Sequence, residues 1–195
     1  SRIEETQQLY SQITSYENQI QDKEVLAIVA KAHYHLGEIF LAAKENESAL
    51  RAFEKAASFS GAEEVRLSAL FQCAAIHEES GARAQAFALY SQIRKDYPNN
   101  PYSDYVQYRL GLLSLQLGDI DTAVVFFLEF NKHYDRSDFL DDVNYYLGSA
   151  YLQSGQFGAA SKQLNNFLYV FLDSAYRNDA QYLLALSLYK QGQFQ

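Results

Sequence analysis

The sequence is poor in the residues that break helices or cross-link chains. Its 195 residues include two prolines, nine glycines and one cysteine, and it has neither methionine nor tryptophan. So few prolines and glycines disfavour a protein rich in turns or short strands, and they favour helices. The single cysteine, Cys73, excludes a disulfide within the chain.

Long apolar runs and an excess of positive charge are also absent. No segment approaches the roughly 18 consecutive apolar residues of a membrane span, and the first residues do not form a signal peptide. We therefore expect no direct membrane insertion. Lysine and arginine number 16 against 24 acidic residues, a net charge of −8. This balance argues against nucleic acid or an anionic membrane surface as the main partner, because both require a basic face.

The sequence does contain one pattern written five times, each copy 37 residues after the last. The third copy reads "YRLGLLSLQLGDI" and the fourth reads "YYLGSAYLQSGQF". A fixed period of 20 to 50 residues is typical of stacked helical repeats. Each copy holds a small residue three positions after its first aromatic residue, where we expect a neighbouring helix to come close: Gly37, Ala74, Gly111, Gly148 and Ala185.

The remaining columns predict a helical hairpin. Seven residues after the small position, four copies have glycine, which is typical of a helix C-cap followed by a turn. Lys44 interrupts this column, and we expect Asn46 to take the strained conformation there. An alanine and, four residues later, a large apolar residue then form the buried stripe of a second helix: Ala49, Ala86, Ala123 and Ala160, followed by Phe53, Tyr90, Phe127 and Leu164.

Start signals divide the chain into units. Asn100, Ser137 and Ser174 are 37 residues apart, and each is a good N-cap residue. A single domain over 1–195 is expected, with full repeats at 24–60, 61–97, 98–134 and 135–171 and a truncated fifth repeat at 172–195. Residues 1–22 form either an orphan second helix or a coiled-coil lead-in. Ten helices are expected in all.

This order of small, glycine, alanine and aromatic positions resembles the tetratricopeptide repeat (TPR), a helix–turn–helix unit, over essentially the whole chain. The resemblance implies an all-α fold, an α-solenoid with a right-handed superhelical twist. The usual TPR period is 34, so the three extra residues are expected to lengthen each first helix by about one turn. The segment "YPNNPYSDYVQYRLG" resembles bacterial cell-envelope TPR proteins such as the β-barrel assembly lipoprotein and the Tol–Pal coordinator. That likeness implies a periplasmic or envelope location, with a cytoplasmic one as the alternative.

The resemblance also implies a concave groove lined by the first helices. Tyrosine and arginine are common hot-spot residues, and such a groove suits an amphipathic helix or an extended apolar segment. The alternative, that these side chains only pack within the array, stays open. The candidate partner-binding residues are Tyr108, Arg109, Leu112, Tyr145, Tyr146, Ser149, Leu183, Leu186 and Tyr189, with Leu115, Leu152 and Tyr182 beside them.

Other chemistry is disfavoured. Cys73 and His77 share one helix face, as a metal site or a thiolate–imidazole pair would require, but they lie in core columns of the repeat. The acidic run "DFLDD", residues 138–142, suits the first turn of a helix better than a calcium site. No phosphate-binding loop or nucleophile elbow is present. We expect no cofactor and no metal, and a protein that is not an enzyme.

The expected function is a non-catalytic scaffold that binds a partner protein or peptide in the groove of the C-terminal repeats. The alternative is an assembly module that joins a multi-protein complex through its convex face or its open ends. We interpret the chain as an excised piece of a longer protein. Its truncated last helix is expected to leave Tyr182, Leu186 and Tyr189 partly bare, which would promote self-association.

Overall fold

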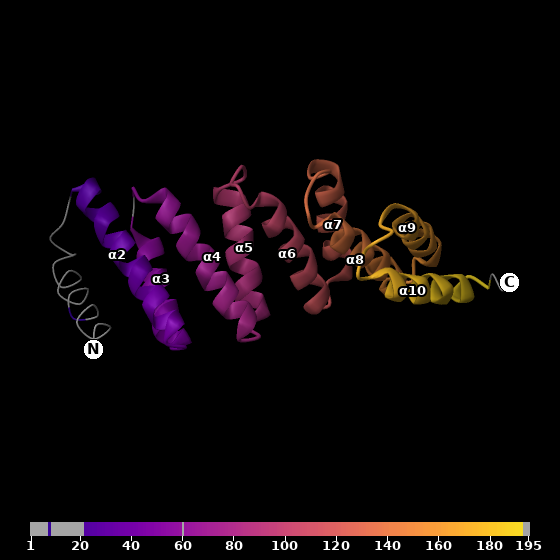
Figure 1. Ribbon diagram of the computed structural model, residues 1–195, viewed down its shortest axis with the longest axis horizontal. Coiled ribbons are helices and arrows are strands. Elements are labelled where there is room, and N and C mark those ends of the chain that lie inside the picture. The colour runs from indigo at the N-terminus through magenta and orange to yellow at the C-terminus, as the bar shows by residue number, and fades with distance from the viewer. Residues whose placement is uncertain (1–7, 9–21, 60, 193–195) are drawn as a thin grey trace. The chain divides into compact units, whose positions relative to one another are not determined.

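The computed structural model describes residues 8, 22–59 and 61–192, and in that part of the chain the secondary structure consists of helices and turns (Figure 1). The helix expected over residues 1–22 lies outside the described residues. Nine helices are described: α2 (Lys23–Ala42), α3 (Asn46–Ser58), α4 (Glu63–Glu79), α5 (Arg83–Asp96), α6 (Ser103–Gln116), α7 (Ile120–His133), α8 (Leu140–Gln153), α9 (Phe157–Val170) and α10 (Arg177–Lys190).

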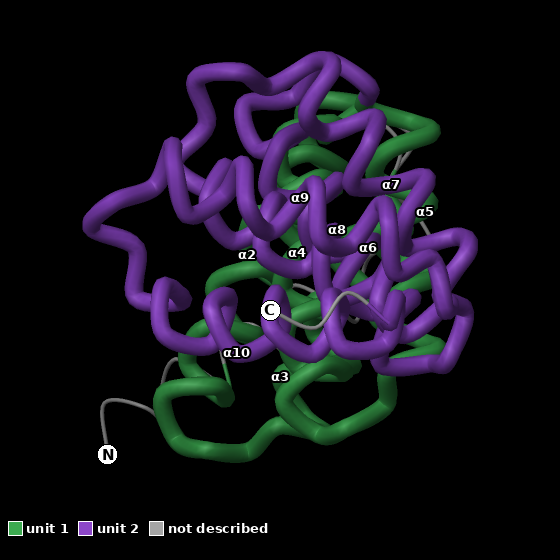
Figure 2. Tube along the Cα trace, turned by 90° about the vertical axis from the view of Figure 1, so that its right-hand side faces the viewer, with its two compact units in different colours: residues 1–97 green, residues 98–195 purple. Residues whose placement is uncertain are grey.

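The chain forms two compact units, residues 1–97 and 98–195, drawn in different colours in Figure 2. In the N-terminal unit, α3 packs against α2 and α4, and α4 packs against α5. In the C-terminal unit, every helix from α6 to α10 packs against the next one along the chain. Alternate helices also touch, α2 with α4 and α8 with both α6 and α10. Stacked helical hairpins of this kind are the packing of an α-solenoid.

The small column of the repeat lies where two helices cross closely, as predicted. In three hairpins a fully buried side chain of the second helix covers a glycine of the first: the pairs are Gly37–Phe53, Gly111–Phe127 and Gly148–Leu164. A Cβ atom added to Gly37 would lie 2.6 Å from Cε1 of Phe53. Glycine is therefore needed here for space, and its conformational freedom is not used.

The turn glycines have the opposite role. Gly81, Gly118, Gly155 and Gly192 follow the first helix of their hairpins with φ angles of 79°, 84°, 75° and 73°. Left-handed backbone of this kind is the C-cap conformation that favours glycine. The expectation for the first hairpin was wrong: Lys44 itself has a φ of 62°, whereas Asn46 is the first residue of α3.

The helix start signals have the predicted hydrogen bonds but not the predicted position. Asn100 Oδ1 accepts from the Tyr102 N–H at 2.7 Å, and Ser137 and Ser174 accept in the same way two residues along the chain. The α-helices then begin three residues later, at Ser103, Leu140 and Arg177. In these three repeats the extra residues therefore form a capped turn, and the expected lengthening of the first helix by one turn is wrong there.

The same two serines join consecutive repeats. Ser137 Oγ donates to Asp104 Oδ2 at 2.7 Å, and Ser174 Oγ donates to Asp141 Oδ2 at 2.8 Å. Donors and acceptors are each 37 residues apart, so one hydrogen bond is repeated from hairpin to hairpin. Each entry turn is thereby fixed to the first helix of the preceding repeat.

Helix α2 is the one described helix with the length and hydropathy of a membrane span. It carries Lys23, Glu24 and Lys31, and it packs against α3 and α4. The ring of His33 on α2 is buried and stacks on Phe59 with centroids 5.7 Å apart. α2 therefore packs as the first helix of a hairpin, on the face that carries His33.

Candidate functional site

The candidate residues lie on three first helices of the C-terminal unit. Tyr108, Tyr145 and Tyr182 hold the same repeat position on α6, α8 and α10, and α8 contacts both of the other helices. The spacing of 37 residues thus places corresponding side chains on adjacent helices. We call the surface of the nine predicted residues, Tyr108 to Tyr189, the first-helix face.

Exposure divides the first-helix face. Tyr108 and Leu112 on α6 are buried, with 7% and 8% of their surface exposed. The other candidates on α6, α8 and α10 are partly exposed, and Tyr189 is exposed, with 60% of its surface accessible. Tyr182, beside them, is 68% exposed. The accessible part of this face therefore consists of Arg109 on α6 and the candidate residues on α8 and α10.

Next to the first-helix face is the carboxylate of Asp142, in the first turn of α8. Its Oδ1 atom accepts a hydrogen bond from the Tyr108 hydroxyl at 3.0 Å and one from the Tyr176 hydroxyl at 2.7 Å. The carboxylate thus joins α6, α8 and the entry turn of α10. Its position in the first turn is as predicted, but its contact with the tyrosines was missed.

Two stacked ring pairs repeat across this face. Tyr108 stacks on Phe139 with ring centroids 5.1 Å apart, and Tyr145 stacks on Tyr176 at 4.4 Å. Both partners come from the entry turn of the following repeat. The signal for them was available in the sequence, since Tyr102, Phe139 and Tyr176 form an aromatic column with the same period of 37.

Arg109 is the basic residue among the candidates. Its guanidinium carbon lies 5.8 Å from the ring centroid of Tyr105 and 5.9 Å from that of Tyr108. Burial lowers the pKa of Arg109, and the neighbouring Tyr146 opposes that shift. An arginine remains charged in this setting, so the arrangement is a cation over two tyrosine rings.

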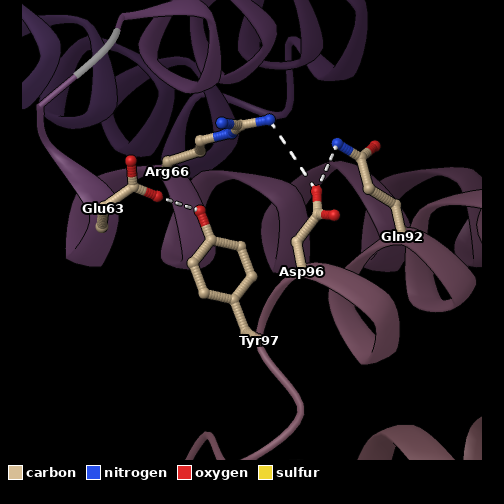
Figure 3. A network of polar contacts seen from close by, with 5 residues as sticks. All are labelled: Glu63, Arg66, Gln92, Asp96 and Tyr97. Atoms are coloured by element: carbon tan, nitrogen blue, oxygen red, sulfur yellow. Dashed lines mark hydrogen bonds and ion pairs between the residues drawn. The ribbon is translucent and has the colours of Figure 1, made fainter.

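A second carboxylate–tyrosine contact lies in the N-terminal unit, between α4 and the end of α5 (Figure 3). The Tyr97 hydroxyl donates to Glu63 Oε2 at 2.6 Å. Beside it, Asp96 Oδ2 accepts from Gln92 at 3.4 Å and lies 3.9 Å from an Arg66 nitrogen. Burial and the Glu63 contact raise the pKa of Tyr97 from its ordinary value of 10.0 to about 12.

Alkaline pH is expected to destabilise the fold. Burial and Asp142 also raise the pKa values of Tyr108 and Tyr176. The folded chain therefore holds these hydroxyl protons to a higher pH than the unfolded chain does. The stability they contribute is complete below about pH 10 and is lost as the pH rises towards 12.

Thermal unfolding followed by circular dichroism between pH 8 and pH 11.5 measures this effect. The melting temperature should fall above about pH 10, and Tyr97→Phe should make the fall shallower. A melting temperature independent of pH over this range would contradict the assigned hydrogen bonds.

Cys73 and His77 do not form a reactive pair. The Cys73 side chain is buried with 2% exposure, and burial, with a smaller effect of Glu54, raises the pKa of its thiol to about 12. At neutral pH it is a protonated thiol, which is a poor nucleophile and a poor metal ligand. Both residues line a hollow of about 440 Å³ between α3, α4 and α5. Within the described residues, no group of three or more His, Cys, Asp or Glu side chains could hold a metal ion.

Comparison with known proteins gives the family. Models described as "Tetratricopeptide repeat" match residues 30–62, 68–100 and 105–137, which together make up just over half of the chain. No curated protein matches the chain by sequence.

Solved TPR structures are similar in fold. MamA from AMB-1 is 19% identical with a TM-score of 0.66, and the match covers 85% of this chain and 84% of that one. MamA from Desulfovibrio magneticus RS-1 is also 19% identical, with a TM-score of 0.67 and coverage of 84% and 86%. YrrB, described as a TPR protein with an unusual peptide-binding site, is 13% identical with a TM-score of 0.66 and coverage of 84% and 78%.

At these identities the similarity shows the fold alone, and it confirms the expected all-α solenoid of TPR type. The repeat matches and the stacked hairpins agree, and the chain belongs to the tetratricopeptide-repeat family.

Proposed function

We propose that the chain is a non-catalytic scaffold that binds a segment of a partner protein on its first-helix face. TPR domains are generally interaction modules, and the solved relative YrrB has a peptide-binding site. The observation that carries the proposal is the partial exposure of Tyr145 and Tyr146, which lie side by side on α8 with ring centroids 5.2 Å apart. Tyrosines presented together on rigid helices supply large contact areas at a low cost in conformational entropy.

The test is the binding of a random twelve-residue peptide library to the 195-residue chain. The double variant Tyr146→Lys, Leu186→Lys should lower recovery of bound peptides at least about tenfold, a change of 1.4 kcal/mol in binding free energy. The matched control is Val125→Lys, Leu128→Lys on α7, where the two apolar side chains are 53% and 47% exposed. Equal recovery by the two double variants would refute binding on the first-helix face.

The alternative is an assembly module that uses its convex face or its ends. It is favoured by α7, a second helix, where the apolar side chains of Val125 and Leu128 are exposed. An assembly through this surface should survive the Tyr146→Lys change on α8, whereas binding of a segment should not. The cell-envelope location implied by the sequence stays a prediction.

A further inference from the structure

We infer that the outer side of α7 is a self-association surface, on which two copies of the chain pair as an antiparallel, two-fold symmetric dimer. The surface is a row of side chains that we call the α7 stripe: Asp121, Val125, Leu128 and Lys132. It is separate from the first-helix face, because α7 is the second helix of its hairpin. A second copy of the chain would then be the partner in the assembly described above.

The α7 stripe lies on the side of the helix opposite the hairpin core. At 3.6 residues per turn, its four positions fall within about 60° of one another around the helix axis. All four side chains are exposed. The buried residues of α7 lie on the other side of the helix: Ala123, Phe126, Phe127 and Phe130. Steps of four, three and four residues along the stripe are those of a coiled-coil seam, so the stripe has the form of a seam without its partner helix.

The two apolar side chains of the stripe are not required by the hairpin. The equivalent positions in the other hairpins hold charged, polar or small residues: Arg51, Ala88 and Lys162 for Val125, and Glu54, Ser91 and Asn165 for Leu128. Five of these six residues are exposed as well, so the fold leaves both positions in water. Helix α7 packs against α6 and α8 through its other side, and hairpins added at either end of the array would not cover the stripe.

The charges of the stripe fit a second copy of the same helix. The midpoint between Val125 and Leu128 is also the midpoint between Asp121 and Lys132. In a two-fold symmetric contact each residue meets a fixed counterpart on the other copy, and the relation is reciprocal. A two-fold axis through this midpoint places Val125 against Leu128 of the partner subunit and Asp121 against Lys132 of the partner subunit. The contact therefore has an apolar centre with an ion pair at each end.

A parallel pairing is disfavoured by the same charges. It would bring the two copies of Asp121 together at one end and the two copies of Lys132 together at the other. Like charges placed against each other oppose a wrong arrangement, so the stripe selects the antiparallel one.

Both charges are available for a partner. Within the described part of the chain, neither Asp121 nor Lys132 takes part in an ion pair. Asp121 lies in the first turn of α7 and Lys132 in the last, where each also suits the helix dipole. The dipole does not account for the two exposed apolar residues between them, whereas a dimer accounts for all four.

One helix from each copy predicts a weak dimer. Helix α7 has 14 residues, and only one side of it is free to pair. Its contact is therefore smaller than the roughly 800 Å² per partner of standard protein interfaces. We expect a dissociation constant of about 100 µM, so the chain is a monomer at the micromolar concentrations used in unfolding experiments.

The experiment is sedimentation velocity at protein concentrations of about 5 µM and about 300 µM, on either side of this dissociation constant. Asp121→Lys turns both ion pairs of the dimer into lysine–lysine repulsions, and Lys132→Asp turns them into aspartate–aspartate repulsions. Each change should weaken the dimer at least about tenfold. In an equal mixture of the two variants every lysine of the stripe meets an aspartate, so the mixture should dimerise as the wild-type chain does. Circular dichroism checks that each variant is folded.

Asp173→Lys is the matched control, because it makes the same charge change at an exposed residue outside α7. It should dimerise as the wild-type chain does. A wild-type chain that stays monomeric at the higher concentration would overturn the inference, as would folded variants whose mixture associates no better than either alone. Association that Asp121→Lys leaves unchanged would place the contact on another surface and overturn it too.

Two double variants separate this dimer from the binding of a segment. Tyr146→Lys, Leu186→Lys should lose bound peptides and still dimerise. Val125→Lys, Leu128→Lys should be monomeric at both concentrations and still recover peptides from the library. Failure of the dimer therefore leaves the proposed function standing, and failure of peptide binding leaves the dimer standing.

Discussion

Replacing Phe127 with alanine is expected to lower the free energy of unfolding by about 3–5 kcal/mol, because the change leaves a cavity among α6, α7 and α8. Phe127 is fully buried, covers Gly111 and stacks on Tyr146 with ring centroids 6.4 Å apart. Since small domains have total stabilities of about 5–15 kcal/mol, one such change removes much of the total. Urea unfolding of wild type and variant measures the difference.

Leu128→Ala is the matched control, because it truncates the next side chain on the same helix. Leu128 is 47% exposed, so the loss should stay within about 0.5 kcal/mol. If the two variants lost equal stability, the assignment of Phe127 to the core of the hairpin would be wrong.

Gly111→Ala is expected to destabilise the fold by about 1–3 kcal/mol, although alanine is the better helix former by about 1 kcal/mol. The reason is spatial: the new Cβ atom would overlap the ring of Phe127. The ring is held inside a packed core and cannot move away without disturbing its neighbours. Chemical denaturation of the single variant gives the size of the effect.

Gly158→Ala is expected to have the opposite effect and to stabilise the fold. Gly158 lies near the start of α9, and its added Cβ would come no closer than 4.0 Å, to Oε1 of Gln191. This variant should gain up to about 1 kcal/mol. Adding Phe127→Leu to Gly111→Ala should recover part of the loss, and a purely additive double variant would argue against direct contact between residues 111 and 127.

Much of the fold could be predicted from the sequence because each hairpin repeats the same spatial requirement. Gly111 and Phe127 are 16 residues apart, as are Gly37 and Phe53, so a close helix crossing appears as two aligned columns. Turn glycines such as Gly118 could also be predicted from the sequence, since few other residues adopt a positive φ angle. Lys44 shows the limit of this reasoning. The turn position after the first helix has a positive φ angle in this hairpin too, although the residue there is lysine.

The candidate site was less predictable because its contacts join different repeats. Asp142 has an ordinary explanation in the first turn of a helix, and no spacing within one repeat connects it to Tyr108 or Tyr176. Burial was also misjudged. Leu112 was assigned to a binding surface, yet it is 8% exposed because α8 packs beside it in the same core cluster.

The ring pairs described above link neighbouring repeats in a fixed direction, because Tyr108 and Tyr145 are each covered by an aromatic residue of the next entry turn. In any array built on this rule, the tyrosine of the last first helix has no aromatic ring stacked on it. Lengthening or shortening such an array by one hairpin would move the bare ring by one hairpin and leave the interior unchanged. The exposed tyrosine ring is thus tied to the end of the array and not to a particular residue. Duplication of one hairpin is enough to move it.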